Sequence, residues 1–238
     1  MAYDNSRRAV AAASTRAQVL EAAHQLFLGK GFSGTTIRSV AESAGVSQET
    51  IYKSFGSKAA LLKAVYDVAL AGDADEAPLA ARPEALAVLE ASTPEASAQA
   101  YADLARIVSV RTDPLLRVLL RSRGSDRALE AFARTTDGER LIGARHFVGH
   151  WHAQRWLRDD VTAPRAAEIV WALNSPEPRW LLLDHGWTQH DFTRWLAETI
   201  HASVLAQQRG GDAKQRRQWS STLGTVSHPD VRHNAEPG

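Results

Sequence analysis

The sequence contains no cysteine and no long apolar run. The first absence excludes disulfides, thiolate metal sites and cysteine nucleophiles, and it fits a reducing compartment. The second excludes a helix that spans a bilayer, which needs about 20 consecutive apolar residues. The N-terminal stretch MAYDNSRRAVAAAST also lacks the apolar core of a signal peptide. We therefore expect a soluble protein of the cytoplasm that has no membrane partner.

Recognisable catalytic patterns are missing as well. The sequence shows no Ser, His and Asp in the order of a catalytic triad, no glycine-rich phosphate loop and no paired carboxylates. We therefore expect neither an enzyme nor a bound cofactor. His146 and His150 stand one helical turn apart, a spacing that can bind zinc. No acidic residue has a matching spacing, however, and His152 falls on another helix face. We expect no metal site and assign these histidines to a polar pocket lining or to the surface.

The composition is that of an ordinary globular protein. Of 238 residues, 44% are apolar and 23% are charged, which is enough apolar material for a sizeable core. The length fits one small and one larger domain. The net charge is only +1, but residues 1–70 carry eight Lys and Arg against five Asp and Glu. This mild basic bias at one end is weak support for a nucleic-acid partner.

Apolar residues recur with a helical period over most of the chain, and no strand-like alternation or fixed repeat appears. The expected fold class is therefore all-α. The pairs Asp113-Pro114 and Ser175-Pro176 indicate helix starts, because proline is favoured in a first helical turn. We predict helices over residues 16–30, 35–44, 47–53, 58–70, 83–91, 95–110, 113–122, 125–157, 164–174, 177–185 and 189–208.

One short stretch, AGVSQETIYKSFGSK at residues 44–58, places two helix starts close together. A turn at residues 44–46 and a helix that begins at Ser47 make a helix-turn-helix with the preceding helix, and the second helix of such a motif enters the major groove of DNA. The alternative is a surface turn between two core helices. Ile51 is expected to be buried under either interpretation. Under the alternative, Tyr52 is simply a packing aromatic.

The residue types along this segment favour contact with a duplex. Gln48 can bind adenine through two hydrogen bonds, and Thr50 offers a hydroxyl and a methyl group to thymine. Glu49 could accept a hydrogen bond from a cytosine amine or point outward to solvent, and the sequence does not decide between these. Helix N-termini attract phosphate through their free N–H groups. The predicted DNA-binding residues are Thr36, Ser47, Gln48, Thr50, Tyr52, Lys53 and Lys58.

The segment TRAQVLEAAHQLFLGKGFSGTTIRSVAESAGVSQETIYKSFGSKAALLKAVYD, about residues 15–68, resembles the N-terminal domain of the tetracycline-repressor (TetR) family. Its AAHQLF, TTI, VAESAGVS and SFGSK elements all stand at the family's spacing. The family often has a small residue at the position of Glu49. The resemblance implies a homodimeric transcription regulator. Its small domain binds a palindromic operator in double-stranded DNA, and a small-molecule effector acts through a larger helical domain. The alternative is a helical domain that responds to a protein partner, which a closed domain without a cavity would favour.

This resemblance and the composition together divide the chain into five parts. The segment AGDADEAPLAARPE is acidic and contains two prolines, as linkers often do, and the C-terminal segment is polar, glycine-rich and aperiodic. The parts are a flexible N-terminal tail at 1–14, the helix-turn-helix DNA-binding domain at 15–70, a linker at 71–82, the helical ligand-binding and dimerisation domain at 83–208, and a disordered tail at 209–238.

The helical domain offers candidates for a pocket and for an interface. The pocket is expected among the helices from residue 95 to residue 157. The segment WALNSPEPRWLLLDHGWTQHDFTRWLAETIHASVL resembles the last helix pair of the family, which pairs with its copy as a four-helix bundle. Its tryptophans could also fill the monomer core, and we expect a mixture of both roles. The expected pocket residues are Tyr101, Leu104, Val108, Leu119, Phe132 and Phe147, and the expected interface residues are Trp171, Trp180, Trp187 and Trp195.

Overall fold

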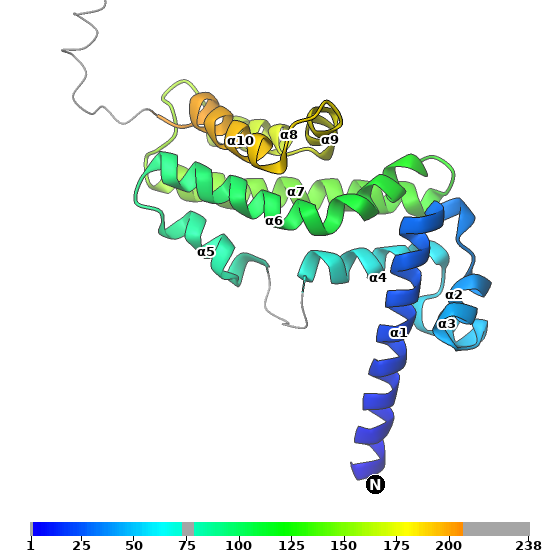
Figure 1. The fold of residues 1–238 in the computed structure, drawn as a ribbon. Coiled ribbons are helices and arrows are strands. Elements are labelled where there is room, and N and C mark those ends of the chain that lie inside the picture. Colours follow the sequence, from blue (N-terminus) through cyan, green and yellow to red (C-terminus); the bar gives the residue numbers. More distant parts are fainter. Residues whose placement is uncertain (1, 73–78, 207–238) are drawn as a thin grey trace, which may run out of the picture. The chain divides into compact units, whose positions relative to one another are not determined.

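Helices form nearly all of the regular structure in the computed structural model, which describes residues 2–72 and 79–206 (Figure 1). Within these ranges no strand occurs, and the pairing of Leu157 with Leu205 is an isolated bridge. The predicted all-α class is therefore confirmed. None of the described helices has the length and apolar composition needed to cross a membrane. The predicted disordered tail at 209–238 lies outside the described residues, as do residues 73–78 of the predicted linker.

The first helix, α1 (Ala2–Gly34), begins well before the expected start at Arg16. Residues 2–14, predicted as a flexible tail, are helical in the structure. The alanine-rich run at 9–13 accounts for this extension, because alanine has the highest helix propensity. Gly31 breaks the helix with φ 69° and ψ 179°, a conformation that is essentially restricted to glycine.

Three short helices follow α1. They are α2 (Ile37–Ala44), α3 (Gln48–Phe55) and α4 (Lys58–Ala71). Each begins after a hydroxyl residue whose side chain accepts a hydrogen bond from the backbone N–H three residues further on. These caps are Thr36, Ser47 and Ser57. Because the caps are local, the helix starts in this region follow from the sequence.

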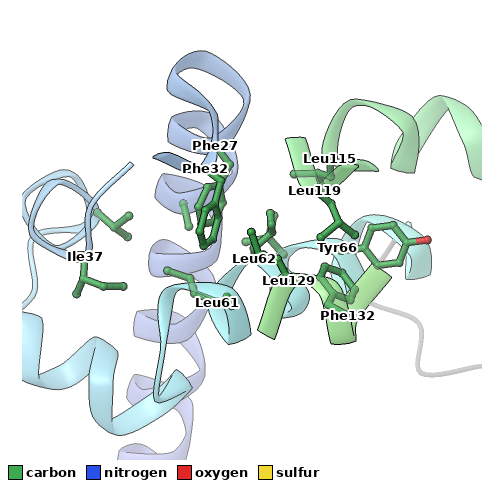
Figure 2. Close-up of a cluster of buried hydrophobic side chains, with 14 of the residues drawn as sticks. Phe27, Phe32, Ile37, Leu61, Leu62, Tyr66, Leu115, Leu119, Leu129 and Phe132 are labelled. Carbon is green, nitrogen blue, oxygen red and sulfur yellow. The ribbon is translucent and has the colours of Figure 1, made fainter. Parts of the chain in front are cut away.

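A first apolar core joins these helices to the rest of the chain. Phe27 of α1, Ile51 of α3 and Leu61 of α4 are buried in it. Tyr66 of α4 packs edge-on against Phe132, with 5.5 Å between the ring centroids, and Figure 2 shows its hydroxyl directed away from the cluster. Further members from the larger helical part are Leu115, Leu119 and Leu129. The helix α4 therefore packs with both parts of the protein.

The larger helical part surrounds a second apolar core. Its elements are the 3-10 helix η1 (Leu79–Ala81), α5 (Pro83–Glu90), α6 (Pro94–Arg121), α7 (Arg127–Ala153), α8 (Ala163–Leu173), α9 (Pro176–Asp184) and α10 (Gln189–Val204). Figure 1 shows α6 and α7 side by side, with α8, α9 and α10 on one side and α4 and α5 on the other. Trp151 is fully buried in this core, and its Nε1 donates to Ser97 Oγ at 2.8 Å.

The predicted helix break at Asp113-Pro114 is wrong, because Pro114 lies inside α6. A proline within a helix costs about 3 kcal/mol. Leu115, Leu116 and Leu119 beyond it are buried, and burial of each leucine contributes about 1.5–3 kcal/mol. The helix therefore continues because its apolar face stabilises it by more than the proline destabilises it.

The helix α7 ends at Ala153, short of the predicted end at residue 157. Arg155 adopts a positive φ of 60°, which stops the helix, and the Trp156 N–H donates to the Trp151 carbonyl at 2.9 Å. The chain then continues to Leu157, which forms the isolated bridge with Leu205, the residue that follows α10. The predicted last helix likewise ends earlier, at Val204 instead of residue 208.

Candidate nucleic-acid interface and ligand cavity

The turn between α2 and α3 is determined by its backbone geometry. Gly45 has φ 67° and ψ 30°, a left-handed conformation that glycine adopts without strain. The Val46 N–H donates to the Ala41 carbonyl at 3.0 Å, and the Val46 side chain packs against the first core. These contacts hold α3 against α2 in the predicted helix-turn-helix.

The first turn of α3 presents polar side chains to solvent. Gln48 and Glu49 are exposed and form no hydrogen bond or ion pair with another described residue. Ser47 Oγ accepts from the Thr50 N–H at 3.1 Å and lies 2.9 Å from Thr50 Oγ1. Both hydroxyls therefore stabilise the helix start, and each keeps hydrogen-bonding capacity for a further partner.

The outward face of α3 continues with Tyr52 and Lys53. Tyr52 is 53% exposed, so it is not a packing aromatic of the core. Ile51, the next residue toward the N-terminus, is the one that is buried. Lys53 is exposed and has no ion pair among the residues that the structure describes. A cationic and a phenolic side chain beside the base-reading positions are suited to bind phosphate and set the register of a duplex.

Thr36 lies at the N-terminus of α2 and is exposed. Its Oγ1 accepts from the Ser39 N–H at 3.0 Å, and its own N–H donates to Ser39 Oγ at 3.1 Å. This reciprocal capping box fixes the start of α2. It leaves the first helical N–H groups, those of Ile37 and Arg38, without intrahelical partners and available to an anion.

Lys58 is placed differently from the other predicted DNA-binding residues. Its Nζ donates to the carbonyls of Phe32 and Thr35 at 2.7 Å and 2.9 Å. The same ammonium lies 4.1 Å from the centroid of the Phe32 ring. Burial lowers the pKa of Lys58. Its side chain therefore binds the connection between α1 and α2, and two of its three N–H donors are engaged there.

A cavity of about 410 Å³ lies between α4, α6, α7 and the connection from α8 to α9. Four of the six predicted pocket residues line it: Tyr101, Leu104, Val108 and Phe147. The prediction for Leu119 and Phe132 is corrected, because neither lines the cavity. Both side chains pack in the first core, where Phe132 meets Tyr66 of α4.

Most of the polar lining was not anticipated from the sequence. Asn174 follows α8, Arg140 lies on α7 and Tyr66 lies on α4, and only the packing of these helices brings them to one cavity. Asn174 Nδ2 donates to the Tyr101 hydroxyl at 3.4 Å. Burial raises the pKa of Tyr66 to about 12 and also raises the pKa of Tyr101. Both phenols are therefore neutral hydrogen-bonding groups near pH 7.

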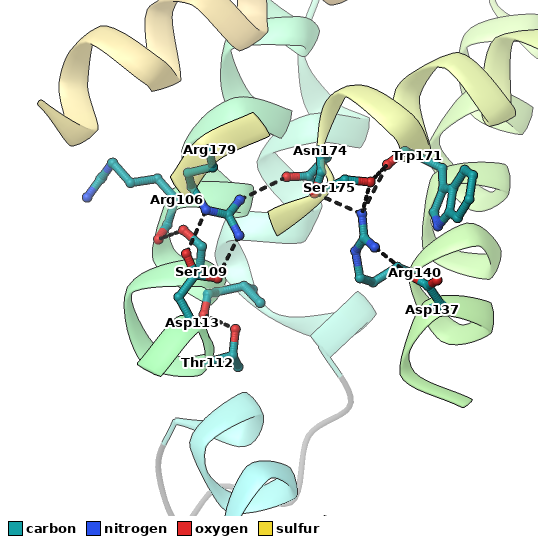
Figure 3. A network of polar contacts seen from close by, with 11 residues as sticks. Arg106, Ser109, Thr112, Asp113, Asp137, Arg140, Trp171, Asn174, Ser175 and Arg179 are labelled. Atoms are coloured by element: carbon teal, nitrogen blue, oxygen red, sulfur yellow. Dashed lines mark hydrogen bonds and ion pairs between the residues drawn. The ribbon is translucent and has the colours of Figure 1, made fainter. Parts of the chain in front are cut away.

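Two arginines connect the walls of the cavity (Figure 3). Arg140 Nη2 donates to the carbonyls of Trp171 and Asn174 at 3.0 Å and 2.9 Å. Arg179 of α9 donates to both carboxylate oxygens of Asp113 on α6. Through these contacts α7 is bound to the end of α8, and α9 is bound to α6.

The four tryptophans expected at a dimer interface have mixed environments. Trp171 and Trp195 pack against the second core, and Trp180 packs against the first. Trp187 is 37% exposed, and its ring centroid lies 6.4 Å from that of Trp195. Leu181 on α9 is 60% exposed. The terminal helices thus bury part of their aromatic surface within the chain and leave another part in solvent.

Two of the three histidines of α7 pack against aromatic rings, and the third, His152, is exposed. His146 contacts Phe147 and His150 contacts Trp156, with ring centroids 5.2 Å and 5.8 Å apart. In the part of the chain that the structure describes, no group of three or more His, Asp or Glu residues could hold a metal ion.

Comparison with known sequences identifies the helix-turn-helix part. Residues 19–65 match a family model described as bacterial regulatory proteins, tetR family. Over 56 residues the chain is 45% identical to the transcriptional regulator TtgR of Pseudomonas putida, covering 24% of this chain and 27% of TtgR. Over 51 residues it is 41% identical to the uncharacterized regulator YvkB of Bacillus subtilis, covering 21% of this chain and 27% of YvkB. The match thus spans about a quarter of the length of these relatives.

Solved structures extend the likeness to most of the chain. NalD, the secondary repressor of the MexAB-OprM multidrug efflux pump in Pseudomonas aeruginosa, has a TM-score of 0.63 at 18% identity, over 82% of this chain and 99% of NalD. A SmeT–triclosan complex has a TM-score of 0.62 at 16% identity, over 82% of this chain and 93% of SmeT. At these identities the likeness concerns the fold alone.

Proposed function

Since the match of residues 19–65 to the family model makes this chain a member of the TetR family, we propose that it is a homodimeric transcription repressor that binds a palindromic operator and leaves it when a small molecule fills the cavity. Its relatives in this family are DNA-binding transcription regulators and not enzymes. The expectation that the chain is not an enzyme is therefore confirmed.

The observation that carries this proposal is the exposed polar edge of the helix-turn-helix. Gln48 and Thr50 occupy the start of α3, where a recognition helix meets base edges. Tyr52 and Lys53 follow on the same exposed surface, where the phosphate backbone would run. We assign base reading to the first pair and phosphate binding to the second, and we add Thr36 and Ser47 as phosphate or base contacts at the two helix starts.

For Lys58 we propose a positioning role. Its ammonium binds the carbonyls of Phe32 and Thr35, and this contact holds the start of α4 against the connection that leads into α2. The phosphate contact expected from the sequence would require the ammonium to leave these carbonyls or to use its one remaining donor.

Release by a small molecule is supported by the position of α4. Tyr66, Asp67 and Leu70 of α4 line the cavity, while Leu61 and Leu62 of the same helix are buried with α1 and α2. A ligand that binds more tightly to one position of α4 would therefore shift the helix-turn-helix and change the DNA affinity. The cavity also favours a small effector over the alternative of a protein partner. SmeT, a protein of similar fold, forms a complex with the small molecule triclosan.

Homodimerisation is supported by the terminal helices. Trp187 and Leu181 leave apolar surface in solvent at the end of the helical part, and such surface is typical of subunit interfaces. A dimer would place two copies of α3 about one helical turn of DNA apart, roughly 34 Å.

Selection of bound duplexes from a random pool tests the proposed function. The full chain is incubated with the pool at near-physiological salt, and the retained duplexes are sequenced. We expect an enriched palindrome whose half-sites are centred about one helical turn apart. If nothing is enriched at either low or near-physiological salt, the chain does not read DNA and the proposal fails.

A further inference from the structure

The two arginines that line the cavity are neutralised by the protein itself. Arg179 forms a bidentate ion pair with Asp113, and both side chains are buried. Arg140 Nη1 lies 2.8 Å from Asp137 Oδ1, and its Nη2 donates to carbonyls at the C-terminus of α8, where the helix dipole is negative. Figure 3 shows the contacts of both guanidinium groups running to these protein groups. Both guanidinium charges are therefore compensated by groups of the protein.

Two carboxylates line the same cavity, and one of them is unpaired. Asp67 accepts from Lys63 Nζ at 2.8 Å and 2.9 Å. Glu139 of α7 also lines the cavity and is exposed, which places it at the mouth. It forms no hydrogen bond or ion pair with any residue in the described ranges. The lining therefore carries one negative charge that no protein cation compensates.

Thr136 adds an unsatisfied group to the same wall. Thr136 is among the residues that line the cavity and is only 4% exposed, and its buried Oγ1 has no hydrogen-bond partner among the described residues. Buried hydroxyls normally have a partner. Thr136 and Glu139 are three residues apart on α7, so they lie on the same helix face. A ligand group that donates several hydrogen bonds at once could reach both.

Aromatic side chains form much of the remaining wall. Tyr66, Tyr101 and Phe147 come from three different helices and meet at the cavity. Their ring faces attract cations as well as apolar groups. Both phenols are neutral near pH 7 even at the ordinary tyrosine pKa of about 10, so they add no anionic charge of their own.

We propose that the cavity selects a small apolar molecule that carries one primary ammonium group. The ammonium pairs with Glu139 and donates to Thr136 Oγ1, and the apolar body packs against Tyr66, Tyr101 and Phe147. An acid of the same shape is disfavoured, because its carboxylate meets Glu139 with like charge and finds no free arginine. This inference rests on the proposed function in one respect, since it takes the cavity as the effector site.

Three probes that share a phenyl group and four methylenes test the selection by charge: 4-phenylbutylamine, 4-phenylbutan-1-ol and 5-phenylpentanoate. Dissociation constants are measured by isothermal titration calorimetry with the full chain and without DNA. We expect the amine to bind about tenfold more tightly than the alcohol, because its ion pair is also a charge-assisted hydrogen bond, and we expect the acid to bind most weakly. Equal affinities for amine and alcohol, tighter binding of the acid, or no binding of the amine at millimolar concentration would overturn the proposal.

Glu139→Gln tests the residue assignment, because it removes the charge and keeps the shape. The amine should lose its tenfold advantage in this variant, and the alcohol should bind as before, which also shows that the variant is folded. Glu90→Gln, at an exposed carboxylate on α5 outside the cavity, should retain the advantage. An undiminished preference for the amine in Glu139→Gln contradicts the role of Glu139.

Release of DNA is measured separately, so that the two proposals can fail independently. The amine is added to the complex of the full chain with its selected duplex. If the amine binds through Glu139 but the complex persists, the ligand class stands and the release mechanism fails. If the chain selects no duplex, the calorimetry without DNA still decides the ligand class.

Discussion

Arg179 of α9 and Asp113 of α6 form a buried bidentate ion pair, with 2.7 Å from Nε to Oδ2 and 2.6 Å from Nη2 to Oδ1. The two side chains are 5% and 11% exposed. In the short helix α9 only Pro176 and Arg179 are buried. The ion pair is therefore a principal contact that holds α9 on α6, beside the cavity and next to the proline inside α6.

Arg179→Met should lower the free energy of unfolding by about 3–5 kcal/mol, because it leaves the Asp113 carboxylate buried without a partner. The double variant Asp113→Leu/Arg179→Met should recover most of this loss, since an apolar replacement of a whole buried pair is often neutral or stabilising. Urea unfolding at one fixed protein concentration compares the three proteins. A single variant as stable as the unaltered chain would mean that the pair does not hold α9.

Lys58→Met should lower the free energy of unfolding by about 1–3 kcal/mol, because the carbonyls of Phe32 and Thr35 lose a charged donor. Its operator binding should keep the salt dependence of the unaltered chain. Urea unfolding and a salt titration of binding separate these effects. Unchanged stability together with a salt slope smaller by about one would show that Lys58 contacts phosphate.

Local signals explain how much of the helix-turn-helix could be predicted. Thr36 and Ser47 cap helices through atoms three residues away, and Gly45 ends α2 through its own backbone conformation. Such features involve neighbours in the chain, so a short stretch of sequence carries them. The inward placement of Lys58 was missed because it depends on carbonyls 23 and 26 residues away.

The cavity was predictable only in part, because its lining also depends on contacts between residues that are far apart in the chain. Four apolar or aromatic positions on α6 and α7 follow from helical periodicity, but periodicity does not tell which neighbour each face meets. Leu119 therefore packs toward α4 and not into the cavity. The polar lining depends on contacts such as Arg179 with Asp113, 66 residues apart, and Asn174 with Tyr101, 73 residues apart. No local pattern carries these pairings.

Lys53→Ala should weaken binding to every duplex and reduce the slope of log K against log salt by about 0.9, because one phosphate contact is lost. Fluorescence anisotropy over a range of salt concentrations measures both quantities. Lys63→Ala is the matched control, since Lys63 lies on α4 and pairs with Asp67. Binding that is unaltered at every salt concentration would remove Lys53 from the interface.

Leu181→Glu should shift the protein from dimer to monomer, because it places a charge on exposed apolar surface of the terminal helices. Sedimentation velocity at several protein concentrations measures the shift. Ile142→Glu serves as the control, because Ile142 is similarly exposed, at 64%, but lies on α7. A dimer that persists in Leu181→Glu and dissociates in Ile142→Glu would move the interface to α7.

Gln48→Ala should lose discrimination at one base pair in each half-site, by about 1–3 kcal/mol, because a bidentate side-chain contact distinguishes bases by this amount. Duplexes with single changes across the selected operator are compared for the variant and the unaltered chain. Gln25→Ala, at an exposed glutamine on α1 that binds Glu21, should leave every preference as it was. If Gln48→Ala also keeps every preference, Gln48 does not read bases, and Glu49 would then be expected to accept a hydrogen bond from a cytosine amine.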